Sequence, residues 1–188
     1  RYFIKHFLSL EQLGVYAGFQ ELLTKIFSLI LFPVTMAVHP KIMNLWNEMN
    51  YRTSIQVIGL GFIIQVFIFL LFAVPVFLFT PSIFGFISQL MPSLNQEYKN
   101  LLIPLFLTGF IWQISLMIHK PLELKERTHL MFIFILVSLI INIIGNILFI
   151  PQYGLIATAY TALISAIVYL VLASLASYPT LRQTLRSI

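Results

Sequence analysis

Two long apolar runs, joined by a four-residue break, constrain the fold more than any other feature of this chain. The runs cover residues 130–150 and 155–176, and the break between them reads Pro-Gln-Tyr-Gly. An α-helix rises about 1.5 Å per residue, so about 20 residues cross the roughly 30 Å hydrocarbon core of a bilayer. A proline and a glycine in so short a link favour an immediate return of the chain. The two runs therefore predict a transmembrane helical hairpin.

The composition of the whole chain also indicates a membrane protein. Hydrophobic residues make up 60% of the 188 residues and charged residues only 9%, whereas a soluble domain carries about 25% charged residues. Lipid admits helices and closed barrels alone, and continuous apolar runs without alternation favour helices. The net charge of +5 comes from scattered residues, which is typical of basic cytoplasmic loops and not of a nucleic-acid surface. We expect no nucleic-acid partner.

The same reading applied to the rest of the chain predicts five transmembrane helices in one all-α domain covering residues 1–188. Pro33 lies inside the first span, and Pro40 is expected to end it, so that residues 41–50 form a separate interfacial helix. The chain opens on Arg1, and we expect it to be part of a longer protein. The predicted spans are residues 14–38, 54–80, 101–118, 130–150 and 155–176.

The lysines and arginines outside the spans predict the orientation. Cytoplasmic loops carry an excess of these residues, and seven of them fall on the side of the C-terminus against three on the other side. We therefore expect a cytoplasmic C-terminus, with the links 39–53 and 119–129 on the same side. The seven are Lys41, Arg52, Lys120, Lys125, Arg127, Arg182 and Arg186, and the three are Arg1, Lys5 and Lys99.

Four polar residues of the first span are candidates for a functional site. Glu21 and Lys25 lie one helical turn apart, and Thr24 and Ser28 extend the same stripe. A lone charge near the bilayer centre costs about 2.5 to 3.5 kcal/mol, so it is normally paired or faces water. One interpretation is a self-neutralising pair near the interface. The other is a water-filled cavity lined by this face, which we favour because Lys25 lies deep enough in the span that snorkelling alone would strain its side chain.

Two asparagines of the fourth span form a second candidate stripe. Asn142 and Asn146 lie one turn apart, with Ser138 on the same side. Amide groups in lipid either bond a neighbouring helix or line a polar path, and the sequence leaves both interpretations open. The small residues of the fifth span predict a helix-packing face. They are Ala157, Thr161, Ser165, Ala162 and Ala166.

No pattern typical of an enzyme is present in the sequence. The four histidines lie at the ends of the predicted spans, and the chain has no cysteine and no HExxH motif. No acidic pair falls within a span. We therefore expect neither catalysis nor a cofactor or metal.

Several motifs together resemble the polysaccharide (O-antigen type) flippases of the multidrug/oligosaccharidyl-lipid/polysaccharide exporter superfamily. The most specific piece is the predicted hairpin, and one departure from the family pattern is Ala157, where a second glycine is common. Prolines 33 and 40 match those near the end of a family helix. The matching pieces are Arg1-Tyr2-Phe3, Leu13-Gly14-Val15-Tyr16-Ala17, and Asn142 to Asn146 followed by Ile150-Pro151-x-Tyr153-Gly154.

The resemblance implies that these are five helices of the C-terminal lobe of a twelve-helix, two-lobed transporter in the bacterial cytoplasmic membrane. Its partners would be the N-terminal lobe of the same chain, membrane lipid, and an oligosaccharide linked to an isoprenoid pyrophosphate. On that hypothesis Lys25 meets the pyrophosphate, and Glu21, Thr24, Ser28, Asn142 and Asn146 line the cavity. The alternatives are a multidrug or cation exporter or a peptidoglycan-precursor flippase of the same superfamily, and, from a different class, a membrane-embedded polysaccharide polymerase.

Overall fold

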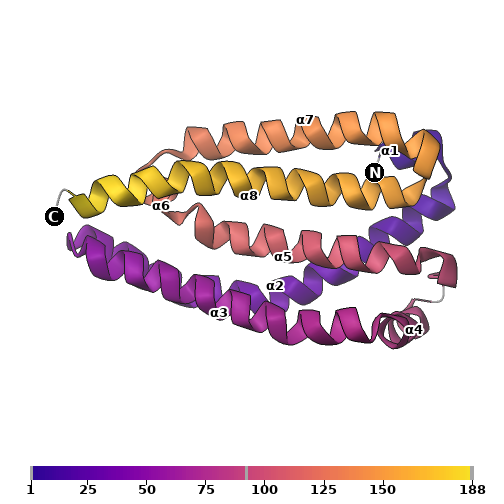
Figure 1. Ribbon diagram of the computed structural model, residues 1–188, viewed down its shortest axis with the longest axis horizontal. Coiled ribbons are helices and arrows are strands. Elements are labelled where there is room, and N and C mark those ends of the chain that lie inside the picture. The colour runs from indigo at the N-terminus through magenta and orange to yellow at the C-terminus, as the bar shows by residue number, and fades with distance from the viewer. Residues whose placement is uncertain (1, 92, 187–188) are drawn as a thin grey trace.

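The computed structural model describes residues 2–91 and 93–186, and this described part consists of helices without a strand (Figure 1). Five of its segments are long and apolar enough to cross a membrane. The prediction of an all-helical bundle with five helices of membrane-spanning length is confirmed. The spanning helices are α2 (Leu10–Asn47), α3 (Tyr51–Leu78), α5 (Leu102–Ile118), α7 (Thr128–Tyr153) and α8 (Leu155–Arg186).

Shorter helical pieces connect the spanning helices in the described part of the chain. Helix α4 follows α3 and turns away from its axis (Figure 1). Its Phe84 and Ile87 are buried, so the piece packs back onto the bundle. Arg1, which belongs to one of the family-like motifs, lies outside the described residues. The pieces are α1 (Tyr2–Phe7), α4 (Thr80–Leu90), the 3-10 helix η1 (Gln96–Leu101) and α6 (Lys120–Leu124).

Helix α8 lies between α7 and α5 at the centre of the bundle (Figure 1). Ala159, Ala166 and Ala173 recur every seven residues along α8 and are fully buried. Small residues at such positions let helix backbones approach closely in lipid, where packing and not the hydrophobic effect drives helix association. The predicted packing face of small residues on the fifth span agrees with this arrangement.

The predicted hairpin of α7 and α8 turns at one residue, Gly154. Its φ of +63° is a backbone conformation that favours glycine. Helix α7 continues through Pro151 to Tyr153, so the proline does not end the helix as the sequence suggested. Glycine 154 alone makes the return.

Helices α7 and α8 approach each other closely at Gly145 of α7. A Cβ atom added there would lie 2.6 Å from the Cγ2 and 3.2 Å from the Cβ of Thr161 on α8. Thr161 is β-branched and short, so it has little freedom to move away. The glycine therefore sets the spacing between α7 and α8.

We predict that Gly145→Ala destabilises the purified protein by about 1–3 kcal/mol, because the added methyl group overpacks this contact. A thermal unfolding curve in detergent measures the effect. The matched control is Gly59→Ala, since Gly59 lies in the exposed part of α3 and an added Cβ there meets nothing within 4 Å. Equal unfolding temperatures for the two variants would contradict the prediction.

Helix α2 departs from the sequence prediction. It runs without a break from Leu10 to Asn47, with both Pro33 and Pro40 inside it, so the predicted end near residue 38 and the separate interfacial helix 41–50 are wrong. A proline removes one backbone hydrogen bond and crowds the carbonyl group of the preceding turn. The residues beyond Pro40 pack onto the bundle, since Ile42 is fully buried beside Ile58 and Leu124. Continuing the helix is the less costly solution.

Helices α2 and α3 form the outer layer beside α5 and are joined by buried polar contacts. The Gln65 side chain on α3 donates to the Thr35 hydroxyl on α2 at 2.8 Å, and the Ser54 hydroxyl donates to the Ile42 carbonyl oxygen at 3.2 Å. The apolar core lies between α2 and α5, where Phe27 packs against Phe106. The opposite faces of α3 and α7 expose large apolar side chains, as a surface in contact with lipid does.

Candidate functional site

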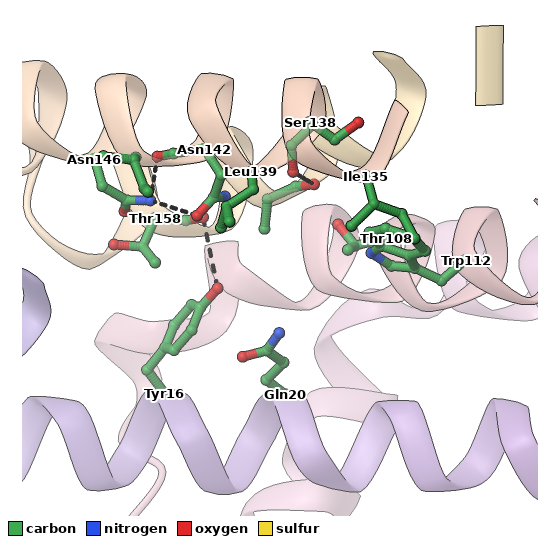
Figure 2. Close-up of a pocket in the computed structure, with 13 residues that line it drawn as sticks. Tyr16, Gln20, Thr108, Trp112, Ile135, Ser138, Leu139, Asn142, Asn146 and Thr158 are labelled. Carbon is green, nitrogen blue, oxygen red and sulfur yellow. Dashed lines mark hydrogen bonds between the residues drawn. The ribbon is translucent and has the colours of Figure 1, made fainter. Parts of the chain in front are cut away.

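A polar cavity of about 610 Å³ lies between α2, α5, α7 and α8 (Figure 2). This volume falls within the range of about 300–1,000 Å³ typical of small-molecule sites. One wall belongs to α7, and the other walls belong to α2, α5 and α8. The lining residues are Tyr16, Gln20, Thr108, Trp112, Ile135, Ser138, Leu139, Asn142, Ile143, Asn146, Thr158, Ala162 and Ser165.

The α7 wall carries a polar stripe made of Ser138, Asn142 and Asn146. The four-residue spacing places all three side chains on one face of the helix. The amide nitrogen of Asn146 donates to the backbone oxygen of Asn142 at 2.7 Å and to its side-chain oxygen at 3.0 Å. These two bonds fix the orientation of the Asn146 side chain at the cavity wall.

Tyr16 and Gln20 extend from α2 towards this stripe (Figure 2). The Tyr16 hydroxyl donates to the backbone oxygen of Thr158 on α8 at 3.5 Å, and so crosses one end of the cavity. Trp112 of α5 lies near the other end of the cavity (Figure 2), and its ring is partly exposed. The cavity thus offers amide and hydroxyl groups on several sides and an aromatic ring.

Three buried oxygens of the cavity wall have no hydrogen-bond partner within the described residues. They are the hydroxyl oxygens of Ser138 and Thr158 and the amide oxygen of Asn146, a residue that is only 4% exposed. A buried polar group without a partner costs about 1–3 kcal/mol. Neighbouring protein atoms cover these three oxygens, so a molecule in the cavity reaches them only if the wall shifts, and the cavity is wide enough to hold water or a polar ligand beside them. The geometry is that of a site for a polar molecule.

The lining residues are all uncharged at neutral pH. Hydroxyl and amide groups both donate and accept hydrogen bonds, so they match a neutral ligand that carries many such groups. Within the described residues, no cluster of three or more His, Asp or Glu side chains could hold a metal ion.

The structure places Asn142 and Asn146 in the cavity and the four α2 candidates outside it. The Lys25 ammonium contacts the Glu21 carboxylate at 2.8 Å, and these side chains are 71% and 53% exposed respectively. The Thr24 hydroxyl donates to the backbone oxygen of Gln20 at 2.8 Å. Ser28 accepts a hydrogen bond from Gln113 of α5 at 3.0 Å.

The reason for this separation is the helical position of the residues on α2. Tyr16 and Gln20 occupy the face towards α7 and α8, whereas Glu21 and Lys25 lie about 140° further round the helix. The Glu21–Lys25 pair therefore belongs to a second, exposed polar surface of the same helix.

Sequence reasoning missed most of the wall opposite α7. Tyr16 and Gln20 lie four residues apart, which is the spacing that revealed the asparagine stripe, so this signal was available. Thr158 and Ser165 are single hydroxyls among small residues, and only the packing of α8 shows that they face the cavity. Ala162, predicted as part of the packing face, also lines the cavity.

We compared the chain with models of known protein families, with curated proteins and with solved structures. It matches none of them.

Proposed function

We propose that this chain forms part of a transporter that flips isoprenoid-pyrophosphate-linked oligosaccharide across the bacterial cytoplasmic membrane for surface polysaccharide synthesis. The observation that carries the proposal is the neutral polar cavity with three unpartnered buried oxygens among the membrane-spanning helices. A bundle with a purely structural role gains nothing from an unfilled polar space, because each unsatisfied group reduces its stability.

The chemistry of the cavity wall suits the sugar part of such a substrate. Sugar hydroxyls donate and accept hydrogen bonds, as do the amides of Asn142 and Asn146 and the hydroxyls around them. The Trp112 ring adds an apolar face beside these polar groups, a combination that orients a ligand within a concave site. The resemblance of the α7–α8 hairpin to polysaccharide flippases supports the same class of substrate.

The exposed Glu21–Lys25 pair supports a second contact surface. Lys25 lies about four turns from the N-terminal end of α2, well inside a membrane-spanning helix. A charged pair at such a position does not face lipid without a large cost, so it faces water or another part of the protein. In our proposal this face of α2 borders the central passage between this lobe and an N-terminal lobe of the same chain. The Lys25 ammonium then contacts the pyrophosphate.

The alternative transporters of the same superfamily fit these observations less well. Multidrug and cation exporters tend to place carboxylates in the lobe cavity, and the cavity lining contains none. A peptidoglycan-precursor flippase is expected to carry more cavity arginines, whereas the cavity lining contains none.

The proposal is tested by deleting the corresponding gene and locating the lipid-linked repeat units. We expect the units to accumulate in the cytoplasmic leaflet, inaccessible to a membrane-impermeant, sugar-oxidising reagent added to spheroplasts. Lysis should make them accessible. If the units instead reach the outer leaflet and remain unpolymerised, the protein is the polymerase of the alternative hypothesis.

We also propose that the C-terminus is cytoplasmic, on the basis of the seven-to-three distribution of lysine and arginine. The chain contains no cysteine, so single cysteines report the orientation. Ser93→Cys and Arg127→Cys both replace exposed residues. We expect an impermeant maleimide to label Ser93→Cys in intact cells and Arg127→Cys only after lysis. The reverse pattern would overturn the orientation.

A further inference from the structure

Trp112 is more exposed than any other residue of helix α5. Its side chain is 39% exposed, whereas the three residues that follow it, 113–115, are buried. It lines the cavity beside Thr108, which precedes it by one helical turn on the same face (Figure 2). The cavity therefore presents the apolar face of an aromatic ring among hydroxyl and amide groups.

Two buried residues, Tyr169 and His119, hold the Trp112 ring. The centres of the Trp112 and Tyr169 rings lie 5.3 Å apart, and the ring planes meet at 30°, as in an offset aromatic pair. The Tyr169 hydroxyl shares a hydrogen bond of 2.8 Å with the Nδ1 atom of His119. Tyr169 is 2% exposed and His119 is 8% exposed, so Trp112 is the open member of the group. We term these three residues the aromatic brace.

The spacing of residues on α5 explains how one tyrosine contacts both of its partners. Trp112 and His119 are seven residues apart, or about two helical turns, so they lie on the same face of α5. Tyr169 of α8 packs its ring against Trp112 and bonds His119 through its hydroxyl. The His119 and Tyr169 rings meet edge to face at 86°, with their centres 6.2 Å apart. The Trp112 ring thus rests on a support that is fixed to both helices.

We propose that the Trp112 ring is a stacking platform for one sugar ring of the transported oligosaccharide, and that Tyr169 and His119 are positioning residues. This inference rests on the proposed function, because it assigns the sugar of that substrate to one end of the cavity. The face of an aromatic ring is negative, and the C–H groups on one face of a pyranose carry small positive charges. The two faces attract each other, while the sugar hydroxyls point outward from the rim.

Two hydroxyl groups of the cavity lining lie one helical turn from members of the aromatic brace. They belong to Thr108, one turn before Trp112, and Ser165, one turn before Tyr169. Each donates its proton to a backbone oxygen of its own helix, at 2.7 and 2.8 Å respectively, so its oxygen is left to accept. Sugar hydroxyls supply matching donors. A quaternary ammonium ion, which an aromatic face also attracts, supplies none.

The test is fluorine NMR of the full-length protein in nanodiscs, with fluorotryptophan in place of tryptophan. The resonance of Trp112 is identified by its loss in Trp112→Phe and, independently, in Trp112→Tyr. The probe is the oligosaccharide that mild acid releases from the lipid-linked repeat units, at up to about 10 mM, which nearly saturates a site with a Kd of about 1 mM. We expect the Trp112 resonance to shift until the site is saturated. Trp46 is the internal control, since its ring lies 5.2 Å from the Lys125 ammonium and outside the cavity, and its resonance should not shift.

Tyr169→Phe tests the positioning role, because it keeps the ring and removes only the bond to His119. We expect the Kd of the oligosaccharide to rise about two- to tenfold, the value of a typical hydrogen bond, and the Trp112 resonance to change without ligand. The matched control is Tyr160→Phe, which makes the same substitution at an exposed tyrosine of the same helix outside the cavity and should bind as the wild type does. An unchanged Kd and resonance in Tyr169→Phe would overturn the positioning role.

The titration of the wild type decides the main claim whether or not Tyr169→Phe folds. A Trp112 resonance that does not shift at the highest oligosaccharide concentration would overturn the platform. A shift with choline chloride but not with the oligosaccharide would also overturn it, because the ring would then bind a cation. The deletion experiment described above locates the repeat units without reference to Trp112, so the proposed function can hold while the platform fails. If the deletion experiment fails while the resonance shifts, the protein binds the sugar without flipping it.

Discussion

Replacement of Asn146 by leucine is expected to reduce export of the lipid-linked glycan about tenfold or more while leaving the protein in the membrane at normal abundance. The amide oxygen of Asn146 is buried in the cavity wall without a partner, and in our proposal the substrate bonds to it when the wall shifts to admit the sugar. Loss of one such bond is worth about 1–3 kcal/mol, which corresponds to about 5-fold to about 150-fold in binding. Surface polysaccharide in a complementation assay, with an immunoblot for abundance, measures the effect.

The side chains of leucine and asparagine have the same number and branching of heavy atoms, and leucine removes a polar group whose burial is costly in lipid. We therefore expect Asn146→Leu to be no less stable than the wild type, although it loses the two bonds to Asn142. The matched control is Gln56→Leu, which replaces an exposed amide on α3 away from the cavity and should leave export unchanged. Normal export by Asn146→Leu would show that the substrate does not use this wall of the cavity.

The fold was predictable wherever one local rule decides the outcome. The length of the apolar runs predicts the five spanning helices, and the glycine at position 154 is where the hairpin turns. Proline was the misleading residue. Its local cost predicts helix ends near residues 38 and 150, but α2 continues through Pro40 and α7 through Pro151. Beyond Pro40 the buried side chain of Ile42 packs onto the bundle, and this packing outweighs one lost hydrogen bond.

The site was predictable only on the helix that carries its own periodic signal. Asn142 and Asn146 repeat at four residues, and this spacing identifies one wall of the cavity. The opposite wall depends on how α2, α5 and α8 pack, which no single segment encodes. Lys25 was a misleading signal for the cavity. Its charge inside an apolar run drew attention to α2, but the side of α2 that faces the cavity is the one with Tyr16 and Gln20.

Lys25→Ala is expected to abolish translocation while the protein still inserts, provided that the exposed face of α2 borders the substrate path. A pyrophosphate that leaves water needs a fixed positive charge in place of its hydration, and the ammonium of Lys25 supplies one as a point charge. Glu21, one turn away at 2.8 Å, orients this ammonium in the absence of substrate. Lys25→Arg should retain part of the activity. The complementation assay with immunoblotting measures both variants.

A structural role for the pair predicts a different pattern. An exposed pair one turn apart contributes only about 0.3–0.5 kcal/mol, so removing both members together should leave the protein in the membrane. Lys25→Ala is different, because it leaves the Glu21 carboxylate without its cation. If Lys25 matters only as the partner of Glu21, Lys25→Ala should act by lowering abundance, and Glu21→Ala/Lys25→Ala should restore export. If Lys25 contacts the pyrophosphate, the double variant stays inactive at normal abundance. Lys41→Ala, on the exposed surface of the same helix, is the matched control and should export normally. Full export by Lys25→Ala at normal abundance would show that the substrate does not use this charge.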